Sequence, residues 1–268
     1  MTKKIQQLSL VVVASNKESQ QQANTIAEQL ACTVSDKPGL HDLALTVQSN
    51  PLSKIIDLEL TLQKLNPPLK LLLDFNSKRS HYRKQSGGGK QQHIVRATGL
   101  HKNPGLRILD ATAGLGSDSF VLACNSAIIT LVEQHPILSL MLDNAVARAQ
   151  QINELADIAS RMQVCSAIDS IDLIHSLNKQ HHYDVIYLDP MYPSIHKKQA
   201  KAKKSMQIIQ YLLQYYDDQA DQLLSAALSC GVKRIVVKRP TAAKPLINKS
   251  PQSSIESSKT RYDIYIQH

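Results

Sequence analysis

Nine consecutive residues carry the strongest structural signal in the chain: Asp110-Ala111-Thr112-Ala113-Gly114-Leu115-Gly116-Ser117-Asp118, called the glycine loop below. Their first residue ends the run Arg107 to Asp110, which predicts a buried β-strand. Their last residues lead into a segment that predicts a helix. The two glycines let the backbone turn tightly and approach a ligand without a Cβ in the way. An open α/β sheet binds nucleotide-type ligands at such a turn, at the carboxyl end of a strand.

From Arg107 onward, runs with the pattern of strands alternate with segments that have the pattern of helices. This alternation predicts βαβ units and a mostly parallel sheet of the α/β class. The expected strands are Arg107 to Asp110, Ala127 to Val132, Met162 to Cys165, Tyr183 to Leu188, Arg234 to Lys238 and Tyr262 to Ile266. The longest helix is expected over Ser205 to Leu228, and the serine-rich segment Lys244 to Thr260 is expected to be an exposed connection.

The part of the chain before the glycine loop divides in two. Residues 1–75 predict a small α/β module, with a strand at Leu8 to Val13, a helix over Glu18 to Leu30 and β-like runs at Leu43 to Val47 and Ile55 to Leu60. Residues 76–106 are expected to form a basic, glycine-containing linker that leads into a helix over Lys90 to Ala97. Residues 107–268 then make up the main α/β domain.

Length and composition place limits on the class of protein. A chain of 268 residues that is 43% hydrophobic can bury a full core. The four cysteines have neither C-x-x-C spacing nor a histidine at ligand spacing, so we expect no zinc site and no disulfide framework: Cys32, Cys124, Cys165 and Cys230. No apolar stretch approaches the roughly 20 residues that a membrane span needs. The sequence therefore predicts a cytoplasmic protein with neither a metal nor a membrane partner.

The net charge of +9 is concentrated in two segments. No acidic residue occurs between Phe75 and Leu109, and seven basic residues lie within Lys78 to Lys102: Lys78, Arg79, Arg83, Lys84, Lys90, Arg96 and Lys102. Five more lysines follow in a short run: Lys197, Lys198, Lys201, Lys203 and Lys204. Without these 12 residues, 19 basic residues face 22 acidic ones, so the remainder is slightly acidic. A solvated basic face would explain either cluster alone, but because both flank the motifs described here they indicate contact with a phosphate backbone.

The glycine loop itself admits two ligands. It could carry the pyrophosphate of a dinucleotide on the N-terminus of the following helix. However, Ser119 stands where the third glycine of G-x-G-x-x-G would be, and Asp110 precedes the glycines, where it can meet a cationic amino-acid group. These two features favour S-adenosylmethionine.

Two further acids fit an adenosyl ligand. Glu133 ends the next expected strand and is placed to accept hydrogen bonds from both ribose hydroxyls. The alternative is that Glu133 is an exposed acid at a strand end with no ligand. Asp169 follows the third expected strand, where it could meet the adenine amino group or could simply cap a helix.

A second motif closes a buried-type strand: Asp189-Pro190-Met191-Tyr192-Pro193. It is similar to the [D/N]-P-P-[Y/F] signature of methyltransferases that act on amino groups conjugated to a ring or a carbonyl. Such nitrogens are poor nucleophiles because their lone pair is delocalised. The Asp189 carboxylate and the Pro190 carbonyl could accept the amino hydrogens and localise that lone pair, while Tyr192 offers a ring on which a base can stack. Met191, in place of the second proline, argues against a generic adenine or glutamine amino methyltransferase.

Together these stretches resemble the ribosomal small-subunit methyltransferase family RsmJ, from about Leu71 to the C-terminus. The resemblance rests on His81-Tyr82-Arg83-Lys84 with Gly87-Gly88-Gly89, on the glycine loop, and on Asp189 to Pro193 with the lysines after it. It implies a Rossmann-like class I methyltransferase domain with a seven-stranded sheet and a small N-terminal α/β module. It also implies transfer of methyl from S-adenosylmethionine to N2 of one guanine of 16S rRNA, guanine 1516, in free RNA or in the small ribosomal subunit.

The resemblance carries over cofactor contacts at Ser117, Asp118, Glu133, Gln134, Ile168, Asp169 and Asp189, and the motifs and basic segments above supply the other site residues. Cofactor contacts are expected at Asp110, Gly114, Gly116, Ser117, Asp118, Glu133, Gln134, Ile168, Asp169 and Asp189. RNA contacts are expected at Arg79, His81, Arg83, Lys84, Lys90 and the five lysines of the 197–204 run.

Three alternatives stay open at this point. The substrate amino group could belong to DNA or protein rather than RNA. The chain could be a Rossmann oxidoreductase that uses a nicotinamide cofactor, although the missing third glycine and the Asp189 motif argue against this. A non-catalytic RNA-binding protein with a vestigial cofactor site is the third.

Overall fold

The computed structural model describes residues 8–49, 55–77, 89–166, 168–177, 183–191, 204–216 and 218–267, without the side chain of Lys90. The chain forms two compact units. Unit 1 comprises Met1–Leu73 and Ser194–Asp217, and unit 2 comprises Asp74–Pro193 and Asp218–His268. No helix in the described residues is long and apolar enough to cross a membrane.

Unit 1 is built on a five-stranded sheet in the order β2-β1-β3-β4-β5. Its strands are β1 (Leu10–Ala14), β2 (Thr33–Ser35), β3 (Leu43–Gln48), β4 (Asp57–Leu62) and β5 (Leu69–Leu72). β1 pairs in parallel with β2 and β3, while β4 pairs antiparallel with β3 and β5. All five residues of β1 are buried, as expected of a central strand, whereas β4 buries alternate residues.

Four helical elements complete the described part of unit 1. A short turn, η1 (Lys17–Ser19), begins at Asn16, whose side chain accepts a hydrogen bond from the Ser19 N–H. Helix α2 (Gln20–Leu30) buries Ala23, Ile26, Ala27 and Leu30, one stripe at helical spacing, and contacts β1. Helix α9 (Lys204–Leu212), which continues into η3 (Leu213–Tyr215), contacts β5.

Unit 2 has a seven-stranded sheet in the order β11-β12-β10-β9-β6-β7-β8. The strands are β6 (Arg107–Asp110), β7 (Ile128–Glu133), β8 (Met162–Ser166), β9 (Val185–Leu188), β10 (Arg234–Pro240), β11 (Ser253–Glu256) and β12 (Thr260–Ile266). β6 to β10 are parallel, and β12 pairs antiparallel with β10 and β11. The predicted Rossmann-like fold with a mostly parallel sheet is confirmed.

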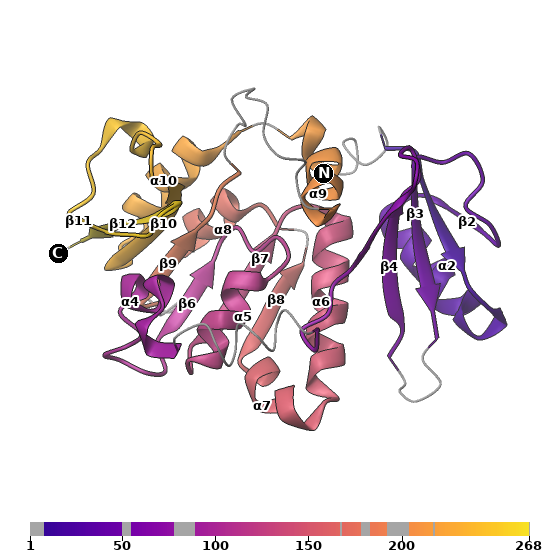
Figure 1. Cartoon of the computed structure of the whole chain (residues 1–268), viewed down its shortest axis with the longest axis horizontal. Coiled ribbons are helices and arrows are strands. Elements are labelled where there is room, and N and C mark those ends of the chain that lie inside the picture. Colours follow the sequence, from indigo (N-terminus) through magenta and orange to yellow (C-terminus); the bar gives the residue numbers. More distant parts are fainter. Residues whose placement is uncertain are drawn as a thin grey trace. The chain divides into compact units, whose positions relative to one another are not determined.

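Helices cover both faces of this sheet, and Figure 1 shows α5 in front of it with α8 and α10 behind. The helical elements are η2 (Gly89–Gln91), α4 (His93–Thr98), α5 (Ser117–Cys124), α6 (Pro136–Gln150), α7 (Asn153–Ser160), α8 (Ser170–Ser176), α10 (Ala220–Ser229) and η4 (Leu246–Asn248). One core cluster joins α8 and α10 to the sheet through Ile174, Leu224, Ile186 and Val237. Strand order reverses at β6, with β7 and β8 on one side and β9 and β10 on the other. Such a switch point opens a crevice at the carboxyl ends of the strands.

Two sequence expectations were wrong. The helix expected over Ser205 to Leu228 is two helices, because the chain leaves helical geometry at Tyr216 and the Asp218 carboxylate accepts the Ala220 N–H at the start of α10. Aspartate favours such a cap over a helix interior. The segment Lys244 to Thr260, expected to be an exposed connection, contains η4 and strand β11, which pairs with β12.

Candidate active site

The glycine loop lies at the carboxyl end of β6 and is held by its own acid. Asp110 is buried, with 2% of its surface exposed, and its carboxylate accepts hydrogen bonds from the Thr112 N–H at 3.1 Å and from the Ser119 hydroxyl. Gly116 has φ +66°, and a Cβ there would lie 2.7 Å from Leu142 Cδ1 and 3.0 Å from Phe75 Cζ. The loop therefore needs glycine at 116 both for its backbone conformation and for space.

Glu133, at the end of β7, ties that strand to the glycine loop. One carboxylate oxygen accepts the Gly114 N–H at 2.9 Å, and the other accepts the His135 N–H at 2.7 Å. Burial raises the pKa of Glu133, and the two backbone hydrogen bonds oppose that rise. Each oxygen keeps a lone pair for another donor. Gln134 follows directly and is partly exposed.

The start of α8 lies beside the same loop. The Ser170 hydroxyl donates to the Ala111 carbonyl, which joins the N-terminus of α8 to the residue after β6. Asp169 caps this helix by accepting the Ile171 N–H at 2.8 Å, so the capping role is present in the structure. Ile168 is 39% exposed. The structure thus brings the residues predicted after β6, β7 and β8 to one edge of the sheet.

Strand β9 delivers the second motif to this edge. All four of its residues are buried, and the Asp189 N–H that follows donates to the Thr112 hydroxyl oxygen at 2.6 Å. The two loops after the adjacent strands β6 and β9 are thereby held together. Pro190 is partly buried, Met191 is 44% exposed, and Tyr192 lies outside the described residues.

Lys238, which belongs to neither sequence motif, connects the two. Its Nζ lies 2.7 Å from Asp118 Oδ2 and 2.7 Å from Asp189 Oδ2. The buried Tyr187 also donates its hydroxyl to Asp118 Oδ2, at 2.7 Å. A sequence signal existed, because Lys238 ends the apolar run of a parallel strand and so must lie at the carboxyl edge of the sheet.

Burial and charge set the ionisation of this cluster. Burial raises the pKa of Asp189, and the ammonium of Lys238 opposes the rise. Burial alone would lower the pKa of Lys238, but Asp118 and Asp189 outweigh it and raise that pKa, so the ammonium stays charged. Burial raises the pKa of Asp110 to about 7, despite its hydrogen bonds from Ser119 and Thr112. Within the described residues, the carboxylates of Asp118 and Asp189 both contact the ammonium of Lys238, and this excess of negative charge suits a cationic ligand.

The expected RNA-contact residues lie almost entirely outside the described part of the chain. These are Arg79, His81, Arg83, Lys84, Lys197, Lys198, Lys201 and Lys203, together with the side chain of Lys90. Lys204 is described: it is exposed and begins α9 in unit 1.

Comparison with known proteins decides the family. A family model for SAM-dependent methyltransferases matches residues 30–267. A ribosomal RNA small subunit methyltransferase J from Nitrosococcus oceani is 39% identical over 259 residues, which cover 94% of this chain and 97% of that protein. The chain belongs to the ribosomal RNA small subunit methyltransferase J family. A family member from Photobacterium profundum is 36% identical, with 97% of this chain and 98% of that protein covered.

The structure of this chain is also similar to that of a solved methyltransferase. A SAM-dependent methyltransferase from Neisseria gonorrhoeae has a TM-score of 0.71 and 26% identity, and covers 96% of this chain and 95% of that chain. S-adenosylmethionine is accordingly the cofactor of this methyltransferase J chain. The described residues fit it, because the sulfonium and ammonium of the cofactor are cations, and the two carboxylates of Asp118 and Asp189 exceed the charge of the Lys238 ammonium that they share.

Proposed function

We propose that this methyltransferase modifies the exocyclic N2 amino group of one guanine of 16S rRNA, guanine 1516, in free RNA or in the small ribosomal subunit. Two findings support the substrate class: relatives at 36–39% identity over nearly the whole chain are named ribosomal RNA small subunit methyltransferases, and the Asp189 motif suits a conjugated amino group. The base and its position rest on the family resemblance.

The observation that carries the chemistry is the position of Asp189. Its carboxylate closes a buried strand, lies at the cofactor edge and is paired with Lys238 at 2.7 Å. The ion pair favours the ionised form, which accepts hydrogen bonds and donates none. Asp189 can therefore hold an amino group with its lone pair directed toward the cofactor.

In the proposed mechanism, the bound cofactor supplies an electrophilic methyl group on its sulfonium. The Asp189 carboxylate and the Pro190 carbonyl accept the two N2 hydrogens and orient the nitrogen. Tyr192 stacks on the guanine ring. After transfer, the proton leaves N2 for Asp189 or for solvent. Positioning and charge placement provide most of the acceleration.

We assign the remaining residues as follows. Cofactor contacts are made by Asp110, Gly114, Gly116, Ser117, Asp118, Glu133, Gln134, Ile168, Asp169 and Asp189. The rRNA backbone contacts the basic segment 76–106 and the lysines of 197–204. Residues 1–75 act as a module that helps to position RNA on the methyltransferase domain 107–268.

The experiment is transfer of labelled methyl from S-adenosylmethionine to 16S rRNA and to small subunits from a strain that lacks this gene, followed by nucleoside analysis. We expect N2-methylguanosine at a single site. Absence of label on RNA and subunits, with cofactor binding intact, would overturn the substrate assignment, and label on DNA or protein would replace it. Tight binding of NADH in place of S-adenosylmethionine would favour an oxidoreductase.

A further inference from the structure

A concave site lies at the opposite edge of the unit 2 sheet from the glycine loop and Asp189. It is a cavity of about 310 Å³, called the basic cavity here. Its wall contains the first residue of β9 (Val185), the first residue of β10 (Arg234) and the segment after α4. Because β9 and β10 are parallel, their first residues lie at the amino edge of the sheet, whereas Asp189 lies at the carboxyl edge.

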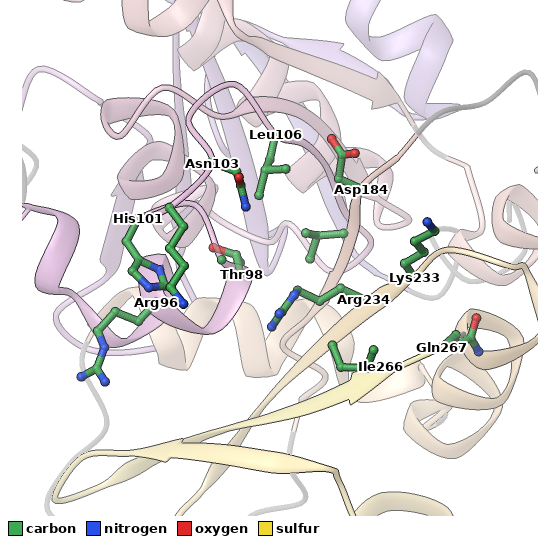
Figure 2. Close-up of a pocket in the computed structure, with 13 residues that line it drawn as sticks. Arg96, Thr98, His101, Asn103, Leu106, Asp184, Lys233, Arg234, Ile266 and Gln267 are labelled. Atoms are coloured by element: carbon green, nitrogen blue, oxygen red, sulfur yellow. The ribbon is translucent and has the colours of Figure 1, made fainter.

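The wall of this cavity carries an excess of positive charge. Four of its side chains are cations, Arg96, Lys102, Lys233 and Arg234, and one is an acid, Asp184. Figure 2 shows Arg96 and His101 on one side of the cavity, Lys233 and Asp184 on the other, and Arg234 between them. Asp184 already accepts the Arg107 N–H at 2.7 Å. Within the described residues, none of the four cations forms an ion pair with a carboxylate.

Structural roles account for only part of this charge. Arg234 donates to the Ala97 carbonyl at 3.0 Å and so supports the end of α4, and partial burial lowers its pKa. Arg96, Lys102 and Lys233 have no comparable bond among the described residues, and all three are exposed. Nδ1 of His101 is buried in the same region without a hydrogen-bond partner there. Three exposed cations with no carboxylate partner among the described residues suit this cavity to an anion.

We propose that the basic cavity binds backbone phosphates of the RNA substrate, an inference that rests on the proposed function. Guanidinium and ammonium groups are the side chains that recognise phosphate. Arg96 and Lys102 also belong to the acid-free segment between Phe75 and Leu109, whose charge by itself indicates contact with a phosphate backbone. The exposed side chains of Arg96, Lys102 and Lys233 are accessible to an RNA chain.

The distance to the reaction centre is compatible with one polynucleotide. Val185 lines the cavity and Asp189 follows four residues later on the same strand, a separation of about 13 Å at about 3.3 Å per residue. A folded RNA that presents a base to Asp189 extends well beyond this distance. Phosphates on the cavity would set the orientation of the RNA without contacting the base, because backbone contacts position a nucleic acid and base contacts specify it.

The test compares two doubly substituted proteins that each lose two exposed lysines. The cavity variant is Lys102→Gln with Lys233→Gln, and the matched control is Lys249→Gln with Lys259→Gln, on exposed positions outside the cavity. Arg234 is left intact because it supports α4. The dissociation constant for a 16S rRNA fragment is measured against salt concentration, together with KM and kcat for methyl transfer and the affinity for S-adenosylmethionine.

We expect the cavity variant to weaken RNA binding on the order of tenfold at 0.1 M salt and to reduce the salt slope by about 1.4 to 2. KM for RNA should rise, while kcat at saturating RNA and cofactor affinity stay unchanged. The control should lose less than about threefold. Equal losses in the two variants would overturn the proposal, because general electrostatics would then explain both.

A further titration measures binding of inorganic phosphate alone to the wild type and to the cavity variant. Binding of phosphate to the wild type but not to the cavity variant, with an unchanged KM for RNA, would assign the cavity to a free phosphorylated ligand and overturn the RNA assignment. The same measurements distinguish failure of the cavity assignment from failure of the proposed function. If the wild type methylates rRNA and the variants do not differ, only the cavity assignment is wrong; if the wild type neither methylates nor binds RNA, both are wrong.

Discussion

At the residue scale, the active site is organised by one ammonium shared between two carboxylates. Lys238 lies 2.7 Å from both Asp118 and Asp189, and Tyr187 donates to Asp118 from a fully buried position. In the proposed mechanism Lys238 is a positioning residue, because its contact holds the Asp189 carboxylate and its charge opposes the rise in the pKa of Asp189. Two predictions follow from these contacts.

Asp189→Asn should lower kcat for methyl transfer on the order of 10² to 10³-fold, because the amide keeps one acceptor oxygen but loses the ion pair and donates hydrogens toward the amino group. Affinity for S-adenosylmethionine, measured by calorimetry, should change far less than kcat. The exposed α8 acid Asp172 provides a control, as Asp172→Asn removes the same charge away from the site. Full activity in a folded Asp189→Asn protein would contradict the mechanism.

Lys238→Met should shift the acid limb of the kcat/KM profile to higher pH. Burial already raises the pKa of Asp189, and without the opposing ammonium that pKa should rise further. In the proposed mechanism activity requires ionised Asp189, which exists above its pKa, so activity should fall on the acid side of the profile and recover as pH increases. Lys238→Arg keeps the positive charge, so the acid limb of its kcat/KM profile should stay near the pH of the wild type.

Tyr187→Phe is the matched comparison for Lys238, since it removes a hydrogen bond to Asp118 without removing charge. An acid limb that stays in place in Lys238→Met but moves in Tyr187→Phe would show that charge is not the cause.

At the element scale, the glycine loop and α5 pack so closely that one methyl group matters. Gly116→Ala should destabilise the protein by about 2 to 4 kcal/mol, from a left-handed φ and a contact of 2.7 Å with Leu142. Gly105→Ala shares the left-handed φ, at +85°, but meets nothing within 4 Å, so it should cost only about 1 to 2 kcal/mol. Urea denaturation of both variants measures the difference, and equal losses would mean that the contact with Leu142 relaxes freely.

Elements also show where local pattern misleads. The amphipathic run from Ser205 to Leu228 is periodic enough to predict one helix, yet α9 and α10 contribute to different units. Helical periodicity states which side chains share a face, not which neighbour covers that face. The strand β11 was missed because Ser253 to Glu256 has little apolar character and becomes a strand by pairing with β12.

At the scale of the whole molecule, the chain passes from unit 2 into unit 1 and back. Residues Ser194–Asp217 belong with the N-terminal module, and α9 contacts β5. Ile208 and Leu212 of α9 are fully buried. Removal of residues 1–73 alone would therefore leave an apolar helix face without its sheet.

We expect a chain that begins at Asp74 to self-associate, because exposed apolar patches drive association. The same truncation with Ile208→Gln and Leu212→Gln should self-associate less. Light scattering during size-exclusion chromatography distinguishes the two. Equal, monomeric behaviour of both truncated chains would show that α9 does not depend on unit 1 for burial.

The sequence by itself determined the Rossmann-like sheet, the glycine loop with Asp110, and Asp189 at a strand end. These features are local, since hydrophobic period, turn residues and strand ends are set by neighbours in the chain. Tertiary structure alone decided that Lys238 pairs with Asp118 and Asp189, 120 and 49 residues away, and that β9, β10 and the segment after α4 enclose the basic cavity. Both depend on which strands become neighbours in the sheet, and strand order follows from packing of the whole core rather than from any local pattern.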